Sequence, residues 1–153
     1  MPVVDSKTRE IDAKEIVHIA MEETGSKYTQ EQGEAAILAE SSMPNVIPMR
    51  EGNTLFIIHY VPKQKDRGLF RVLNADTAAN YVKNTRQFLK AAGMIGFKIL
   101  VVQFESPEPL TLFKKIMRDP PFTGMGYTIE KSQDGKRYRA TINMGNTGKG
   151  ATK

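Results

Sequence analysis

The sequence predicts a mixed α/β fold built around one strand–helix–strand unit. Residues 68–74 alternate apolar and polar side chains, as a half-buried strand does, and residues 97–104 are the most apolar run in the chain. A helix ending near residue 92 connects them, and such a crossover requires parallel strands and a right-handed path. Ligands of βαβ units bind where the strands end and the helix begins. We therefore expect any small-molecule site near residues 74–79 and 103–107.

Two helices are predicted ahead of this unit. Residues 11–24 place apolar side chains at helical spacing. Thr29 and Gln32 form a capping box, and the helix that they open ends before Pro44. Both helices need a sheet on which to bury their apolar faces. Residues 2–4 are read as a short edge strand.

Two hairpins and one short helix complete the prediction. In chain order they are strands 45–50 and 54–61, a helix from Pro107 to about residue 119, and strands 127–131 and 136–143. Residues 62–68 are predicted to be a polar, mostly basic loop. Met125 and Met144 lie beside glycines, and we expect them to contribute to a contact surface.

Composition indicates one ordinary globular domain. The 153 residues are 40% hydrophobic and 25% charged, which suits a single core. We expect residues 1–144 to form this domain and residues 145–153 to be a flexible basic tail. The chain has no cysteine, two histidines and no long apolar run. Disulfides, thiolate chemistry and a membrane-spanning helix are excluded, and no metal site is predicted.

The net charge of +5 conceals an uneven distribution. Residues 1–62 carry 5 basic and 10 acidic side chains, whereas residues 63–153 carry 17 and 7. An excess of that size attracts nucleic acid, phosphorylated cofactors or acidic protein surfaces; the alternative is a solvated surface on which the two halves partly neutralise each other. No nucleic-acid-binding motif accompanies the basic residues, so nucleic acid is expected to bind only non-specifically. The two basic clusters are Lys114, Lys115 and Arg118, and Lys136, Arg137 and Arg139.

The order of these elements resembles that of the GNAT N-acyltransferase superfamily over nearly the whole chain. The strongest local likeness is a buried strand, a short helix with the pair Leu112-Phe113, and the pair Gly126-Tyr127. The closing hairpin, with its Asp-Gly turn, is similar to small GNAT-like proteins of tailed phages. The resemblance implies a central, mostly antiparallel sheet with one parallel βαβ pair and helices on both faces.

The resemblance also implies where acetyl-CoA would bind. GNAT enzymes open the crossover helix with a loop of the type Arg/Gln-x-x-Gly-x-Gly/Ala, whose N–H groups hold the pyrophosphate. The matching loop here, residues 74–79, has no glycine and contains Asp76, whose charge repels a pyrophosphate. The interpretation that we prefer is that Asp76 and Thr77 simply cap the helix. By position, the candidate coenzyme contacts are Val72, Leu73, Asn74, Asp76, Thr77, Ala78, Ala79 and Phe113.

Few residues are placed for proton transfer. Many GNAT enzymes carry a tyrosine after the leucine of the short helix, which protonates the departing thiolate; Phe113 holds this place and has no proton to give. Tyr127 and Tyr81 are substitutes if the geometry allows. Glu105, after the apolar strand, and His59 are the candidate general bases, and each is also explained as an ordinary surface residue.

Two departures in one site favour a fold kept without its reaction. We therefore predict a GNAT-fold protein with a degenerate acyl-CoA site, non-catalytic and cofactor-free, acting through a protein partner in phage assembly or as a host-directed accessory factor. Homo-oligomer formation is left open. The alternatives are an active acetyl-CoA-dependent N-acetyltransferase and a non-specific polyanion binder. The N-terminus has no signal-peptide pattern, so we expect the protein in the cytoplasm, that of the host for a phage protein, or in the virion.

Overall fold

The computed structural model describes residues 30–74, 76–104 and 107–145. Its elements, in chain order, are α2 (Gln30–Ser41), β1 (Val46–Glu51), β2 (Thr54–Val61), β3 (Gln64–Asn74), α3 (Ala78–Ile95), β4 (Ile99–Phe104), α4 (Pro107–Arg118), β5 (Gly126–Lys131) and β6 (Tyr138–Asn143). The predictions for residues 2–4, 11–24, Glu105 and 146–153 lie outside the described residues.

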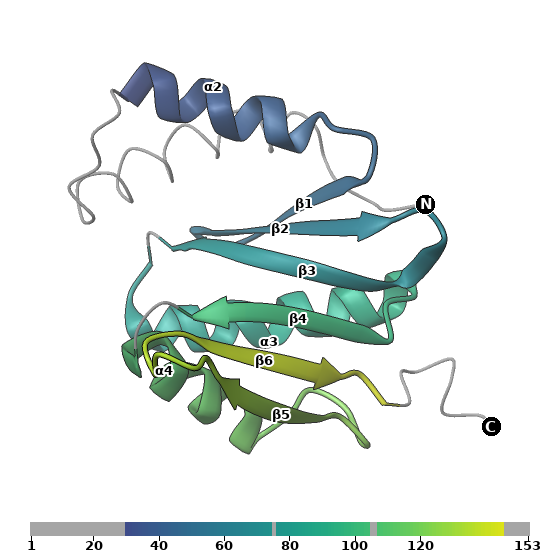
Figure 1. Cartoon of the computed structure of the whole chain (residues 1–153), viewed down its shortest axis with the longest axis vertical. Coiled ribbons are helices and arrows are strands. Elements are labelled where there is room, and N and C mark those ends of the chain that lie inside the picture. The colour runs from purple at the N-terminus through teal and green to yellow at the C-terminus, as the bar shows by residue number, and fades with distance from the viewer. Residues whose placement is uncertain (1–29, 75, 105–106, 146–153) are drawn as a thin grey trace.

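The six strands form one sheet in the order β1-β2-β3-β4-β6-β5 (Figure 1). Every neighbouring pair is antiparallel except β3 and β4, which are parallel and joined by α3. The predicted βαβ unit and both predicted hairpins are therefore confirmed. The mixed α/β class and the mostly antiparallel sheet are confirmed with them.

Helices cover both faces of the sheet, as predicted. Alternate residues of a strand point to opposite faces. Phe56 of β2 points to α3, where its ring stacks on that of Phe88 with centroids 4.1 Å apart. His59 of the same strand points the other way and contacts Glu40 of α2. α3 and α4 share one face, and α2 lies on the other (Figure 1).

The main core lies between the sheet and the layer of α3 and α4. Phe88, Leu100 and Ile142 are fully buried there, and α4 contributes one apolar face, as its helical spacing predicts. Met125 and Met144 belong to this core, with exposed fractions of 8% and 0%. The prediction that these two methionines form a contact surface is wrong, because both side chains pack inside the core. A neighbouring glycine does not by itself make a residue exposed.

Two element boundaries differ from the prediction. Residues 64–67, predicted to be loop, extend β3: Gln64 pairs with Val61 of β2 and Arg67 pairs with Ile99 of β4, although all four side chains of residues 64–67 are exposed. α3 continues through Gly93 to Ile95, since one glycine inside a helix costs only about 1 kcal/mol. Gly96 ends the helix with a φ of 126°, and its N–H bonds the carbonyls of Ala92 and Gly93.

Candidate functional site

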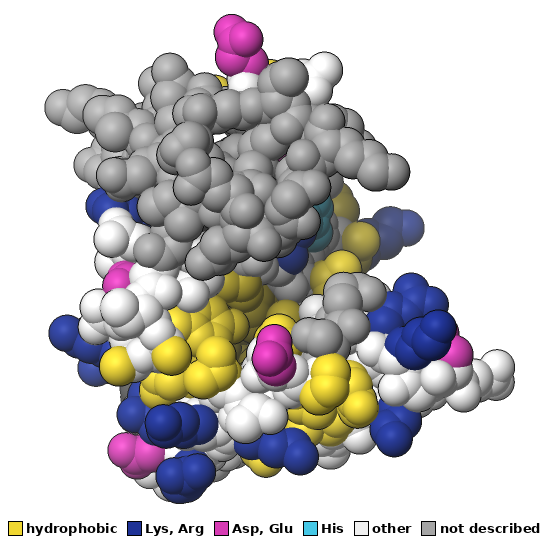
Figure 2. Space-filling model, turned by 90° about the vertical axis from the view of Figure 1, so that its left-hand side faces the viewer, with side chains coloured by type: hydrophobic (Ala, Val, Ile, Leu, Met, Phe, Trp, Pro, Cys, Tyr) yellow, Lys and Arg dark blue, Asp and Glu magenta, His cyan; other side chains and the backbone are white. Residues whose placement is uncertain are grey.

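The strands β3 and β4 separate at the end where the sequence places a ligand. They pair over four residues, from Arg67 opposite Ile99 to Phe70 opposite Val102. Beyond this point β3 stays paired with β2 as far as Asn74, and β4 stays paired with β6. Figure 2 views the molecule from this end, where hydrophobic side chains line a hollow and Lys and Arg side chains surround its lower part. The fold thus opens a wedge between two parallel strands.

The loop that follows β3 is held by hydrogen bonds within the loop and from β2. Oδ1 of Asn74 accepts from the Thr54 hydroxyl at 2.8 Å and from the N–H of Asp76 at 3.1 Å. Thr77 is the N-cap of α3, and its hydroxyl accepts from the N–H of Asn80 at 3.2 Å. The predicted capping role of Thr77 is therefore confirmed.

Asp76 accepts four hydrogen bonds at the start of α3. Oδ1 accepts from the N–H of Thr77 at 3.1 Å and from Nδ2 of Asn80 at 2.9 Å. Oδ2 accepts from the N–H of Asn53 and from Nδ2 of Asn84, both at 3.0 Å. The side-chain amide of Asn80, followed by the backbone N–H of Asn53, lowers the pKa of Asp76 to about 2. A fixed negative charge therefore sits where the helix would offer its N–H groups to an anion.

The predicted coenzyme contacts do not all meet in one place. Asn74, Asp76 and Thr77 lie together in the loop, and Ala78 and Ala79 are exposed in the first turn of α3. Val72 and Leu73 are half-buried and, as neighbours in β3, point to opposite faces of the sheet. Phe113 is only 2% exposed and lies on the buried face of α4.

Phe113, which has no O–H to donate, packs among other aromatic rings. Its ring centroid lies 5.5 Å from that of Phe104 and 5.2 Å from that of Tyr127, which approaches edge-on. Tyr127 is 38% exposed and is the nearest phenol to the predicted donor position along the chain. Tyr81, the other substitute, is buried in the core, and burial raises its pKa.

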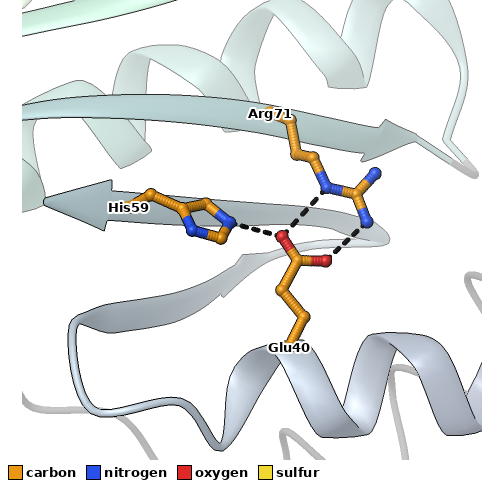
Figure 3. A network of polar contacts seen from close by, with 3 residues as sticks. All are labelled: Glu40, His59 and Arg71. Atoms are coloured by element: carbon orange, nitrogen blue, oxygen red, sulfur yellow. Dashed lines mark hydrogen bonds and ion pairs between the residues drawn. The ribbon is translucent and has the colours of Figure 1, made fainter.

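His59 belongs to a cluster on the face of the sheet that carries α2 (Figure 3). Its Nε2 lies 2.5 Å from Oε2 of Glu40, and Arg71 donates to the same carboxylate from Nε at 3.1 Å and from Nη2 at 2.6 Å. Burial raises the pKa of Glu40, but the hydrogen bonds from Arg71 and His59 outweigh it and hold the pKa below its ordinary value. One imidazole nitrogen is thus committed to Glu40. Glu105, the other candidate base, lies outside the described residues.

The described residues offer neither a metal-binding cluster nor a membrane-spanning helix. Among the described residues, no group of three or more His, Asp or Glu side chains is arranged to hold a metal ion. No helix in the same part of the chain is long and apolar enough to cross a membrane.

The sequence reasoning missed the donors to Asp76. Asp76, Asn80 and Asn84 are spaced by four residues, which places them on one side of a helix, and this spacing was a usable signal. Asn53 and Thr54 were not predictable, because they reach the loop only through the pairing of β2 with β3.

Sequence comparisons find no relative of this chain. No protein-family model matches it, and no curated protein has a similar sequence.

The fold, in contrast, is that of solved N-acetyltransferases. The ribosomal-protein-S18-alanine N-acetyltransferase from Escherichia coli aligns over 95% of this chain and 92% of its own, with a TM-score of 0.54 and 10% identity. A mutant spermidine N-acetyltransferase from Vibrio cholerae aligns over 88% and 91%, with a TM-score of 0.57 and 11% identity. The GNAT domain of an S. lividans protein aligns over 94% and 88%, with a TM-score of 0.55 and 9% identity. The predicted GNAT fold is thereby confirmed.

Proposed function

We propose that this GNAT-fold protein has a degenerate acyl-CoA site and acts through contacts with a protein partner rather than by acyl transfer. The observation that supports this most is the Asp76 carboxylate. It is bonded to the N–H groups of Thr77 and Asn53 at the start of α3, where the resemblance to GNAT enzymes places the coenzyme pyrophosphate.

The negative charge of Asp76 repels a diphosphate at the start of α3. Two like charges 4 Å apart repel by about 1 kcal/mol in water and by more when partly buried. Asp76 stays charged at neutral pH because its pKa is about 2. Moving it aside would break four hydrogen bonds, and the loop has no glycine that would let a phosphate approach the backbone more closely.

Proton transfer is weakened independently. A buried phenylalanine, Phe113, stands where many GNAT enzymes have the acid that protonates the thiolate. Orientation of two substrates supplies most of the rate in acyl transfer, so this loss alone lowers activity without abolishing it. Together with Asp76, it favours a retained fold with a new role. We place that role in phage assembly or in a host-directed accessory factor, in the host cytoplasm or the virion.

Calorimetric titration with acetyl-CoA tests the proposal. The unmodified protein is expected to show no saturable binding up to about 1 mM, which corresponds to about −4 kcal/mol. Asp76→Asn removes the charge and is expected to bind at least about fivefold tighter, the equivalent of roughly 1 kcal/mol. Asp134→Asn is the matched control, because this carboxylate also has a lowered pKa but lies in the β5–β6 turn. Micromolar binding by the unmodified protein, together with turnover on an amine, would end the proposal.

An active N-acetyltransferase is the second candidate, and the separation of β3 from β4 favours it. Such a wedge can admit the pantetheine arm that carries the acyl group, even if the loop of residues 74–79 does not bind the pyrophosphate. Thiol release from acetyl-CoA is the assay, with acceptors taken from the structural neighbours: spermidine, an aminoglycoside and a peptide with N-terminal alanine. This candidate predicts turnover with at least one acceptor and its loss in Thr77→Glu, which puts a second carboxylate at the helix start. No thiol release with any acceptor excludes these substrates.

A further inference from the structure

A groove runs along α3, beside the segment that follows α4. Its volume is about 380 Å³. It begins at the first turn of the helix and is closed on one side by the segment that follows α4. The lining residues are Ala79, Val82, Lys83, Arg86, Gln87, Lys90 and Pro121.

The charge of this groove is entirely positive. α3 carries Lys83, Arg86 and Lys90 and has no acidic residue in its 18 positions. Among the described residues, neither Lys83 nor Lys90 forms an ion pair, and both are exposed. Two cations that face water without a carboxylate are free to bind an anionic partner.

Arg86 joins the groove to a second basic group on α4. It donates from Nε to the carbonyl of Ile116 and from Nη2 to the carbonyl of Lys115, both at 3.2 Å. These are the last turns of α4, where Lys115 and Arg118 are exposed. The guanidinium is thus fixed in place between the groove and the last turns of α4.

The uncharged part of the groove lining is mostly apolar and contains no aromatic residue. Ala79, Val82 and Pro121 are its apolar residues, and Gln87 is its polar one. Single-stranded nucleic acid binds by stacking its bases on aromatic side chains, and the groove lining has none. Apolar lining residues beside cations instead match a protein segment that carries an apolar side chain between carboxylates.

We infer that this groove, which we call the α3 groove, docks an acidic amphipathic segment of a partner protein. The inference rests on the proposed function, because it names the surface through which a non-catalytic GNAT fold would act. Lys83 and Lys90 are seven residues apart, roughly 10 Å along the helix axis, so they can meet carboxylates two turns apart on a facing helix. The apolar residue of the segment then covers Val82 and Pro121.

The test is binding of a defined peptide, measured by fluorescence anisotropy on the full chain. The probe is a fluorescein-labelled peptide of about twelve residues, rich in Glu with Leu at every fourth position. The double variant Lys83→Glu with Lys90→Glu is expected to weaken binding by about tenfold, the equivalent of roughly 1.4 kcal/mol. The control is Lys63→Glu with Lys65→Glu, an equal charge change at exposed sites in the β2–β3 hairpin, and it is expected to leave the affinity within about twofold. Circular dichroism checks that both variants fold.

Several outcomes would overturn the inference. Equal weakening by both double variants would indicate general attraction to net charge, and so would undiminished binding of a peptide with Ser in place of Leu. Tighter binding of a single-stranded oligonucleotide would assign the groove to nucleic acid. Sedimentation showing that the protein self-associates through Lys83 and Lys90 would make a second copy the occupant. Displacement of the peptide by acetyl-CoA would show that the groove binds the coenzyme, and it would also contradict the proposed function. Absence of peptide binding would contradict only this inference, because the acetyl-CoA titration tests the proposed function separately.

Discussion

Glu40 shows how a single carboxylate fastens a helix to the sheet. Its side chain is only 17% exposed, while its partners His59 and Arg71 are 38% and 49% exposed. The burial of Glu40 is unfavourable for its charge and is offset by the hydrogen bonds from Arg71 and His59, so its pKa lies below 4.5. A group with a lowered pKa stabilises the folded state above its ordinary pKa, and this contribution is lost as the pH falls through the lowered value.

Glu40→Gln is therefore expected to destabilise the protein in a pH-dependent way. At pH 7 the free energy of unfolding should fall by roughly 1–1.5 kcal/mol, because hydrogen bonds to a charged group are lost from a partly exposed cluster. The difference from the unmodified protein should shrink steadily on acidification below about pH 4.5, as Glu40 itself becomes protonated. Urea denaturation at several pH values measures this, with Glu31→Gln, an exposed acid of the same helix, as the control. A difference that does not change with pH would mean that packing, not charge, links α2 to the sheet.

At the scale of elements, the β1–β2 turn is coupled to α3 through Gly52. This residue has a φ of 57°, which a side chain disfavours. A Cβ placed on it would lie 2.7 Å from Nδ2 of Asn84, the buried amide that bonds Thr54 and Asp76. The side-chain amide of Asn84 therefore contacts both the β1–β2 turn and the loop of residues 74–79. The positive φ was foreseeable from the Glu-Gly-Asn turn, whereas the contact with Asn84 was not, because it joins segments 32 positions apart in the numbering.

Gly52→Ala is expected to lower the free energy of unfolding by roughly 2–3 kcal/mol, from backbone strain plus displacement of Asn84. Gly135→Ala separates the two causes. Gly135 also has a positive φ, of 72°, but a Cβ there would meet only Lys131 Cδ at 3.8 Å. This control should lose only the strain, roughly 1 kcal/mol. Chemical denaturation of both variants gives the comparison, and equal losses would show that Asn84 moves aside without cost.

At the scale of the molecule, the sequence revealed the connectivity better than the site. Hairpin turns, the apolar strand β4 and the long helix α3 each carry a local signal, so the topology follows from rules on connections. The wedge between β3 and β4 has no local signal, because its position depends on the register of strands about 30 residues apart in the chain. The same holds for the Glu40 cluster, whose three members come from three elements that only the folded sheet brings together. Turns, caps and single elements could therefore be predicted from the sequence, whereas sites built from residues of several strands could not.

Two substitutions that each remove one buried methyl group test whether the two faces of the sheet unfold as one cooperative unit. Ile142 is fully buried on the face covered by α3 and α4, and Ile57 is fully buried on the face that carries Arg71. Ile142→Val and Ile57→Val should each lower the free energy of unfolding by about 0.5–1.5 kcal/mol. In a single domain the double variant should lose the sum within about 0.5 kcal/mol, with one transition and an unchanged dependence on denaturant. Guanidinium denaturation followed by circular dichroism and tyrosine fluorescence measures this, because the chain has five tyrosines and no tryptophan. If one substitution shifts one probe and leaves the other unmoved, the two faces unfold separately, and the single-domain prediction for residues 1–144 is wrong.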